Sequence, residues 1–440
     1  MGHGVCFPVL FVFEHLCIAC QVLALYRPHN RATDEFFGVY VQASPRRLFA
    51  LALALSVGAA LSLGITRFAY GLLLPAMRED LAWSYTLAGA MNTVNAAGYL
   101  MGALLAPWAL RRWDPVLLLS RGALAATVFM ALSGFFTDAA VLLVQRFLAG
   151  LASASVFVTG GLLAARLGAQ DPQRAGWLLG VYYGGTGLGI TVSALLVPWA
   201  LEFFAAQPHG WRYAWWLMAA LCFLGSLVLF WPASQLADGA PAGQQAKRNP
   251  VALRPLVYGL AGYGMFGVGY IGYMTFVVAL LRAEGNSTES IVVFYAVLGV
   301  AVMASSRVWA RLLDREKGGR AMALLNGLLG LATVLPAVSD NFAVLMFSGI
   351  VFGGVFLSIV ASSTALVRHN LPQAQWATGI SAFTVVFAAG QIAGPTMVGW
   401  IADGEGGLAR GLLVSAIALW VGAGLAWRQK PLALNTGLGL

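Results

Sequence analysis

The sequence contains about twelve apolar runs, each long enough to cross a lipid bilayer as a helix. An α-helix rises 1.5 Å per residue, so about twenty apolar residues span the roughly 30 Å hydrocarbon core. Only 10% of the residues are charged and 60% are hydrophobic, which is far from the composition of soluble domains. We therefore predict an all-α membrane protein with twelve transmembrane helices. The runs lie at residues 48-75, 86-109, 115-136, 139-166, 175-200, 211-231, 252-281, 289-312, 320-338, 341-367, 376-401 and 408-427.

The runs divide into two halves of six. The longest polar stretch between runs is rich in Ala, Gly, Pro and Gln, which predicts a cytoplasmic linker. Gly150 and Gly349 are 199 residues apart, and so are Trp177 and Trp376, which indicates a duplicated six-helix unit. We therefore expect two pseudo-symmetric six-helix halves. The predicted parts are an N-terminal bundle at 46-231, the linker at 232-250, a C-terminal bundle at 251-430 and a tail at 431-440.

The loops between the runs alternate in positive charge. One set of alternate loops carries sixteen Arg and Lys residues and the opposite set carries only four. By the positive-inside rule the first set is cytoplasmic, so both ends of the twelve-helix body are cytoplasmic. The net charge of +9 then reflects orientation and not a nucleic-acid partner. Because the basic residues are mostly arginine amid abundant Ala, Gly and Leu, we expect a bacterial protein of the inner membrane.

Residues 1-45 do not fit the twelve-helix plan. The stretch from Val5 to Tyr26 is apolar, but it holds Glu14 and His15 and has no basic segment or cleavage site typical of a signal peptide. Two interpretations remain, an extra span or a translation start assigned too early. We favour the second, because the repeat is complete without this segment.

Family-like motifs occur in three of the runs. Arg146-x-x-x-Gly150 lies in the fourth run, and a glycine-rich segment with Gly185 and Gly189 lies in the fifth. The eleventh run holds Gly390-x-x-x-Gly394 followed by Pro395. With the two-half plan, these motifs resemble those of the major facilitator superfamily across residues 46-430. The resemblance implies a monomeric carrier that works by alternating access, with a substrate site near the membrane midplane between the halves.

The loop motifs match that superfamily only in part. The loop after the second run lacks the acidic residue that the superfamily's gating motif has, whereas the second-half copy keeps Asp314 and Arg315. The resemblance assigns these two residues to gating, together with the motif residues of the runs. The segment from Gly64 through Arg67 to Met77 further resembles the poorly characterised bacterial YbfB/YjiJ-like branch. That branch implies a fold but no substrate.

Arg67 is the most informative residue for function. No Asp or Glu occurs in the apolar stretch from Leu48 to Met77 that contains it. An ionic side chain at bilayer depth costs at least about 2.5 to 3.5 kcal/mol on insertion scales, so it must have a partner or a task. Planar guanidinium donors form bidentate pairs with carboxylates, so we predict that Arg67 binds a small organic anion.

A polar belt is expected at the depth of Arg67. Counting 1.5 Å per residue from the outer ends of the runs puts Arg67 and Arg146 at one level. Each arginine could instead satisfy helix carbonyls or amide side chains and only stabilise the bundle, and this alternative is strongest for Arg146. The predicted binding residues are Arg67, Tyr70, Asn92, Asn95, Arg146, Tyr270 and Gln391.

These features together predict a secondary active or facilitated transporter of a small solute. Motifs such as Gly-x-Ser-x-Gly or His-Glu-x-x-His are missing from the runs, so we expect no enzyme, and no cofactor motif is visible. We expect no metal site either, because Cys17 and Cys20 lack a second ligand pair. Every acid of the body maps to a loop or a run end, so a coupling proton could travel on the substrate, and a counter-anion is equally open. The alternatives are a drug or metabolite efflux carrier and a non-transporting membrane sensor.

Overall fold

The structure is a computed structural model that describes residues 44–171, 173–235, 253–372 and 375–432. All twelve predicted spans are helical, and the described residues contain no strand. The first span consists of α2 (Pro45–Ala59), η1 (Ala60–Phe68) and α3 (Tyr70–Asp80). The remaining helices are α4 (Tyr85–Arg112), α5 (Pro115–Ser133), α6 (Ala139–Ala169), α7 (Ala175–Phe203), α8 (Trp211–Gln235), α9 (Val257–Ala283), α10 (Thr288–Val308), α11 (Ala310–Arg315), α12 (Arg320–Val338), α13 (Phe342–Asn370), α14 (Trp376–Ala402) and α15 (Gly407–Trp427), with a short turn η2 (Arg254–Leu256) before α9.

Polar residues in the short turns determine where several helices begin. The Ser84 hydroxyl accepts a hydrogen bond from Leu87 N at 3.1 Å at the start of α4. Asp114 and Asp138 accept in the same way at the starts of α5 and α6. Such caps satisfy backbone N–H groups that the first helical turn leaves unpaired. The sharp change from apolar run to polar turn is therefore the reason that the predicted boundaries lie within a few residues of the observed ones.

Eleven helical spans in the described residues are long and apolar enough to cross a membrane. The remaining span, α4, has 28 residues and is therefore also long enough. It is less apolar because Asn92, Thr93 and Asn95 lie along its middle. These polar side chains point into the bundle contacts described below, so α4 completes the set of twelve membrane helices.

The first span is not a regular α-helix. Its middle part, η1, is a nine-residue π-helix that contains Arg67. Thr66 Oγ1 donates to the Leu61 carbonyl, five residues back, at 2.6 Å. A Cβ on Gly64 would lie 2.6 Å from Gly189 Cα, so α7 packs directly against the η1 backbone. π-helical segments are rare and are frequent at functional sites, which directs attention to Arg67.

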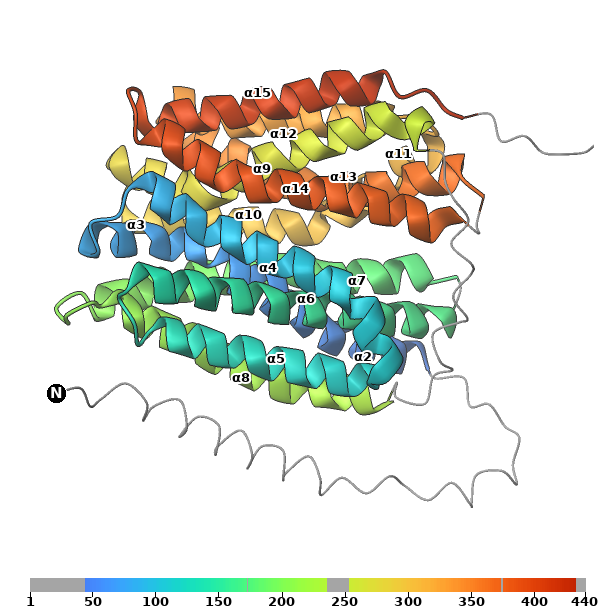
Figure 1. The fold of residues 1–440 in the computed structure, drawn as a ribbon, viewed down its shortest axis with the longest axis horizontal. Coiled ribbons are helices and arrows are strands. Elements are labelled where there is room, and N and C mark those ends of the chain that lie inside the picture. The colour runs from blue at the N-terminus through green and yellow to red at the C-terminus, as the bar shows by residue number, and fades with distance from the viewer. Residues whose placement is uncertain (1–43, 172, 236–252, 373–374, 433–440) are drawn as a thin grey trace, which may run out of the picture. The chain divides into compact units, whose positions relative to one another are not determined.

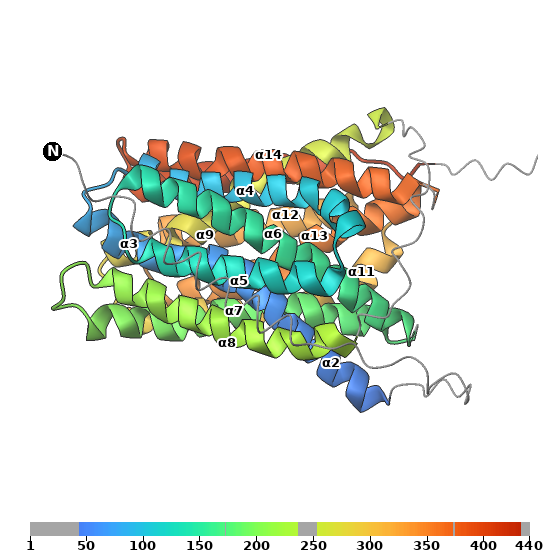
Figure 2. The same cartoon turned by 60° about the horizontal axis from the view of Figure 1, so that its bottom comes forward.

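The helices of each predicted half pack mainly against one another, and the described residues form one compact unit. In Figure 1, α5, α6 and α8 lie on one side of the bundle and α9, α12 and α15 on the other. Helices α4, α7, α10 and α14 run between them, and α4 runs beside α14 (Figure 2). The pairs α4–α14 and α7–α10 therefore join the two halves.

All hydrogen bonds between the halves in the described residues lie in the part of the bundle toward the turn at residues 81–84. We refer to this side as the predicted outer end. The bonds join Asn92 to Thr275, Thr93 to Thr396 and to the Ile392 carbonyl, Thr191 to the Ala296 carbonyl, Tyr295 to the Phe68 carbonyl, and Tyr85 and Thr86 to Asp403. The halves are thus held together at the predicted outer end.

Three of the segments predicted to lie outside the two helical bundles are largely outside the described residues. These are residues 1–43, most of the predicted linker, and the tail from residue 433. The described part differs from the prediction at the start of the linker, because α8 continues through Pro232 to Gln235. Because the composition of this stretch changes gradually, the sequence did not show that the last turn of α8 extends beyond residue 231.

Candidate substrate-binding site

Arg67 is buried and lacks a partner. Its side chain belongs to a residue that is only 2% exposed, and neither Nε nor Nη2 has a hydrogen-bond acceptor among the described residues. No Asp or Glu is buried in the described part of the chain. Nε and Nη2 form one edge of the guanidinium plane, which is the edge that a carboxylate can span with two parallel hydrogen bonds. The geometry of Arg67 therefore suits a planar oxyanion.

Two aromatic rings lie near the Arg67 guanidinium. Its Cζ is 5.8 Å from the Tyr99 ring centroid and 6.0 Å from that of Phe68. Cation–π attraction stabilises the charge in part, but the N–H donors stay unpaired. The sequence reasoning missed Tyr99. Helical spacing could have found it, because Tyr99 follows Asn92 by seven residues and Asn95 by four, on the same face of α4.

Arg146 is engaged by the protein itself. Its Nη1 donates to the Thr66 carbonyl at 2.8 Å and its Nη2 donates to Asn92 Oδ1 at 3.0 Å. The bond to Thr66, the neighbour of Arg67, shows that the two arginines lie at the same level. The guanidinium also lies over the Tyr70 ring, 5.0 Å from its centroid. For Arg146 the bracing alternative therefore fits the geometry better than ligand binding.

Asn92 and Asn95 extend the hydrogen bonds of Arg146 into a network, which we call the brace. Asn92 accepts from Arg146 and donates from Nδ2 to Thr275 Oγ1 of α9 at 2.8 Å, so it links the two halves. Asn95 donates from Nδ2 to the Arg146 carbonyl at 2.9 Å and fastens α4 to α6. Thr275 is a second residue that the sequence reasoning missed. The amide groups of Asn92 and Asn95 are thus bound to other protein groups, and in this conformation they hold α4 in place and do not contact a ligand.

The remaining predicted site residues are tyrosines and a glutamine. The Tyr70 hydroxyl donates to the Ala88 carbonyl at 2.8 Å, so Tyr70 is a packed residue. The Tyr270 hydroxyl donates to Gln391 Oε1 at 2.6 Å, which joins α9 to α14. Tyr270 stacks on Phe356 with 5.2 Å between centroids, and Phe356 meets Phe68, the neighbour of Arg67, at 5.8 Å. The structure thus brings Tyr270 and Gln391 to the region of Arg67.

The glycine motifs permit close helix packing. A Cβ on Gly150 would lie 2.1 Å from the Asn95 carbonyl oxygen. An added Cβ would also meet backbone at 2.4 Å from the Ala60 oxygen for Gly189 and at 2.6 Å from the Val268 oxygen for Gly394. A Cβ on Gly185 would overlap the Ser56 carbonyl, and one on Gly89 would overlap that of Pro395. Small residues at these crossings let helices touch through their backbones.

Asp314 and Arg315 lie at the predicted cytoplasmic end on the short helix α11. Both are exposed, and neither forms an ion pair with another described residue. Their gating role stays a prediction. Cys17 and Cys20 lie outside the described residues, within which no cluster of three or more His, Cys, Asp or Glu side chains could hold a metal ion.

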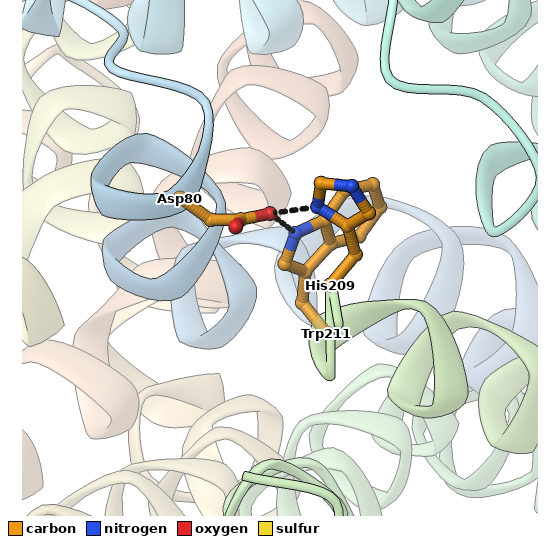
Figure 3. A network of polar contacts seen from close by, with 3 residues as sticks. All are labelled: Asp80, His209 and Trp211. Atoms are coloured by element: carbon orange, nitrogen blue, oxygen red, sulfur yellow. Dashed lines mark hydrogen bonds and ion pairs between the residues drawn. The ribbon is translucent and has the colours of Figure 1, made fainter. Parts of the chain in front are cut away.

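A separate polar network lies at the predicted outer end, as Figure 3 shows. Asp80, the last residue of α3, accepts from Trp211 Nε1 at 2.5 Å and lies 2.5 Å from His209 Nδ1. These contacts fasten the end of the first span to the start of α8. The network borders a pocket of about 550 Å³ that Glu79 and Glu202 also line. The Asp80 network lies more than ten residues along the chain from Arg67 and within the N-terminal half, whereas Arg282 and Thr288 of the C-terminal half also line the pocket.

One protein family and several individual proteins match most of this chain. The family described as the uncharacterised MFS-type transporter YbfB matches residues 59–427. The chain is 22% identical over 372 residues to the cis,cis-muconate transport protein of Acinetobacter baylyi, covering 79% of this chain and 86% of that protein. It is 24% identical to the inner membrane transport protein YdhP of Escherichia coli K12 (79% and 88% covered). It is 27% identical to the chloramphenicol resistance protein of Streptomyces lividans (86% and 95% covered).

Solved structures share the fold at low sequence identity. A bacterial homolog of the human lysosomal transporter Spinster, in an inward-facing and unoccupied conformation, superposes with a TM-score of 0.67 at 16% identity, covering 87% of this chain and 97% of that one. The nucleoside transporter NupG superposes with a TM-score of 0.66 at 13% identity, covering 86% and 100%. These likenesses confirm the predicted two-half helical fold.

Proposed function

The chain belongs to the major facilitator superfamily, in the family of the uncharacterised MFS-type transporter YbfB, and on this basis we propose that it carries a small organic anion bound at Arg67. It is a multi-pass membrane transport protein and not an enzyme, as its relatives are. The observation that carries the anion proposal is the Nε–Nη2 edge of a buried guanidinium, which has no hydrogen-bond acceptor among the described residues.

The charge balance around Arg67 supports an anionic substrate. Arg67 and Arg146 are the buried charged side chains of the described residues, and both are cations. Two cations at one depth repel each other in a medium of low dielectric constant, and no buried acid compensates them. A carboxylate on Arg67 relieves this repulsion and satisfies two unpaired donors at once.

The arrangement of the halves supports transport by alternating access. The hydrogen bonds between the two halves in the described residues are confined to the predicted outer end. This arrangement corresponds to a carrier whose halves are closed on the outer side and are not joined by hydrogen bonds on the cytoplasmic side. The orientation itself, with both ends of the twelve-helix body in the cytoplasm, follows from the loop charges. We propose that the protein works as a monomer in the inner membrane.

The coupling mechanism follows from the missing buried acid. A carboxylate relay for protons needs a titratable carboxyl group within the membrane, and the described residues offer none that is buried. We therefore propose that a coupling proton, where one is used, enters on the substrate itself. Exchange of the substrate for a counter-anion is the equally simple alternative.

A second candidate function rests on one of the relatives. The Streptomyces lividans protein is named for chloramphenicol resistance, and this chain is similar to it over 95% of its length. That similarity favours export of an uncharged aromatic compound. The Acinetobacter baylyi relative is named for cis,cis-muconate transport, which favours the anion. The unpaired guanidinium supports the anion, because an uncharged compound would leave it without a counter-charge.

Ligand-induced thermal stabilisation tests the proposal. The purified full chain is screened against mono- and dicarboxylates, amino acids, chloramphenicol and cationic dyes. A ligand that binds only the folded state raises its stability, by about 2.7 kcal/mol at a concentration of one hundred times Kd. We expect carboxylates to stabilise the protein, and we expect Arg67→Gln to abolish that effect.

Arg121→Gln is the matched control, because Arg121 is also an arginine within a membrane helix but is exposed on α5. Carboxylates should stabilise this variant as well as the unchanged protein. Stabilisation by dyes or by chloramphenicol alone would overturn the anion proposal. Uptake of a bound carboxylate into proteoliposomes then distinguishes a carrier from a sensor, since a sensor binds its ligand without moving it.

A further inference from the structure

We propose that the anion bound at Arg67 is a flat, conjugated monocarboxylate, such as an aromatic acid. This inference rests on the proposed function and adds the substrate class. It comes from the unpaired Nε–Nη2 edge of Arg67, which lies near the Tyr99 ring, and from the contact of the neighbouring Phe68 with aromatic rings of the other half.

The first ring cluster consists of Tyr99, Phe157, Tyr182 and Tyr183, from α4, α6 and α7. Successive centroids lie 6.4 Å apart for Tyr99 and Phe157, 5.7 Å for Phe157 and Tyr183, and 5.1 Å for Tyr182 and Tyr183. Tyr183 is 37% exposed, and Tyr99 and Phe157 are half-buried. This cluster therefore presents accessible ring surface within the N-terminal half.

The second ring cluster consists of Tyr263, Phe266, Tyr270, Phe356 and Phe387, from α9, α13 and α14. Its rings stack nearly parallel: the centroids of Phe266 and Phe387 are 5.1 Å apart at 12°, and those of Tyr270 and Phe387 are 5.6 Å apart at 18°. Tyr270 also stacks on Phe356 at 5.2 Å. Tyr263, Phe266, Tyr270 and Phe356 are buried in this stack, and Phe387 is half-buried, so Phe387 is the ring of this cluster that keeps accessible surface.

Arg67 connects the two clusters. Its guanidinium lies 5.8 Å from the Tyr99 ring of the first cluster. Its neighbour Phe68 meets Phe356 of the second cluster edge to face, with 5.8 Å between centroids. Phe356 in turn stacks on Tyr270, with 5.2 Å between the ring centroids. A carboxylate on the Nε–Nη2 edge therefore lies near the Tyr99 and Phe68 rings, and Phe68 connects it to the rings of the C-terminal half.

This environment selects for flat π-systems. Aromatic pairs gain attraction from offset-stacked or edge-to-face geometry beyond the burial of apolar area. A puckered aliphatic ring of equal volume gains only the burial. A conjugated acid is also planar from its ring to its carboxylate, which lets both groups lie between the two ring clusters.

The number of open cation edges limits the substrate to one carboxylate. Arg146 has both Nη groups bound and only Nε without an acceptor, so it cannot form a bidentate pair. No third charged side chain is buried in the described part of the protein. A second carboxylate would be desolvated against aromatic rings without a counter-charge, which is unfavourable.

Four small probes separate these features, with binding measured by calorimetry on the purified full chain. Benzoate and cyclohexanecarboxylate have the same charge and similar size but differ in conjugation. Terephthalate adds a second carboxylate, and benzamide removes the charge. Two aromatic contacts of ordinary strength predict that benzoate binds about tenfold more tightly than cyclohexanecarboxylate. We expect terephthalate and benzamide to bind more weakly than benzoate.

Two variants connect the preference to the structure. Tyr99→Leu should lower the affinity for benzoate by about five- to tenfold and leave that for cyclohexanecarboxylate within about twofold. Tyr99→Phe keeps the ring and should retain the preference. Phe135→Leu is the control, because Phe135 is an aromatic residue that is 61% exposed at the predicted outer end.

The outcomes distinguish the inference from the proposed function. Equal affinities for benzoate and cyclohexanecarboxylate, both lost in Arg67→Gln, would overturn the conjugated class and keep the anion site. Terephthalate binding more tightly than benzoate would overturn the restriction to one carboxylate. Binding of benzamide as tight as that of benzoate, or no binding by any carboxylate, would overturn the anion site itself.

Discussion

Asp403 forms a contact between the halves whose removal should open the predicted outer end. It follows the last residue of α14, and its carboxylate meets the first turn of α4. Oδ1 accepts from Tyr85 N at 2.7 Å, and Oδ2 accepts from Thr86 N at 2.9 Å and from Thr86 Oγ1 at 2.6 Å. The carboxylate thus caps a helix of the opposite half.

The strength of this contact follows from ordinary capping energies. An acidic group at a helix N-terminus contributes about 0.3 to 1 kcal/mol through the helix dipole, and loss of a capping side chain costs typically about 1 kcal/mol. Asp403 is exposed, so solvent screens its charge and the lower part of these ranges applies. We expect Asp403→Ala to cost the closed outer end about 1 kcal/mol, which changes the ratio of closed to open conformations by about fivefold.

Spin labels across the predicted outer end measure this ratio. Phe135→Cys and Val338→Cys, in a background without other cysteines, put one label on each half at exposed positions. Pulsed electron paramagnetic resonance then measures the distance between the two labels, and the distance distribution gives the closed and open populations. Glu405→Ala is the control, since the carboxylate of this neighbour caps no helix N-terminus among the described residues. A distance distribution that Asp403→Ala leaves unchanged, or that Glu405→Ala shifts equally, would refute the reasoning.

The same contact predicts a dependence on pH. Partial burial alone would raise the pKa of Asp403, but hydrogen bonds from Thr86 and Tyr85 and the charge of Arg78 outweigh it and lower the pKa. The closed conformation is therefore stabilised above the ordinary carboxyl pKa of about 3.9 and loses this contribution as the pH falls through the lowered value. The open population should be constant from neutral pH to about pH 5 and should rise in more acidic solution, and Asp403→Ala should remove the rise.

Two further predictions concern stability, measured by thermal or denaturant unfolding in detergent. Arg146→Gln should lower the free energy of unfolding by about 3 kcal/mol, because it removes charged hydrogen bonds to the Thr66 carbonyl and to Asn92. Arg67→Gln should not lower it, because this change removes a buried charge that has no partner. Equal losses of stability in the two variants would contradict this contrast. Gly185→Ala should prevent stable folding, because its Cβ would overlap the Ser56 carbonyl, whereas Gly354→Ala, with nothing within 4 Å of the new Cβ, should fold normally and yield comparable protein.

Most of the fold could be predicted from the sequence because the bilayer imposes it. Lipid offers no hydrogen bonds, so an apolar run of sufficient length must be a helix, and polar turns must end it. The run predicted at 320-338 coincides with α12 (Arg320–Val338), since charged and polar residues flank both ends. Where composition changes gradually, as at Pro232, the boundary was missed by a few residues.

The π-helix η1 could not be predicted, because its cause lies in tertiary packing. Apart from Arg67, the residues from Ala60 to Phe68 are of types that ordinary membrane helices contain, and nothing in their order indicates a π-helix. The irregular stretch coincides with the crossing where Gly64 and Gly189 bring two backbones into contact. A single sequence shows that both residues are small but does not show that they face each other.

The different roles of the two arginines show most clearly what the sequence lacks. Arg67 and Arg146 are each the lone charge in an apolar stretch, at the same depth, and by the cost of burial they are equivalent. The structure separates them by their acceptors: a carbonyl of η1 and the Asn92 side chain reach Arg146, and no acceptor among the described residues reaches the Nε–Nη2 edge of Arg67. Because Arg146 consumes the nearby carbonyl and amide, it also leaves Arg67 to be satisfied from outside the protein. The brace therefore helps to create the binding site, and loss of Arg146 should weaken anion binding even where the protein still folds.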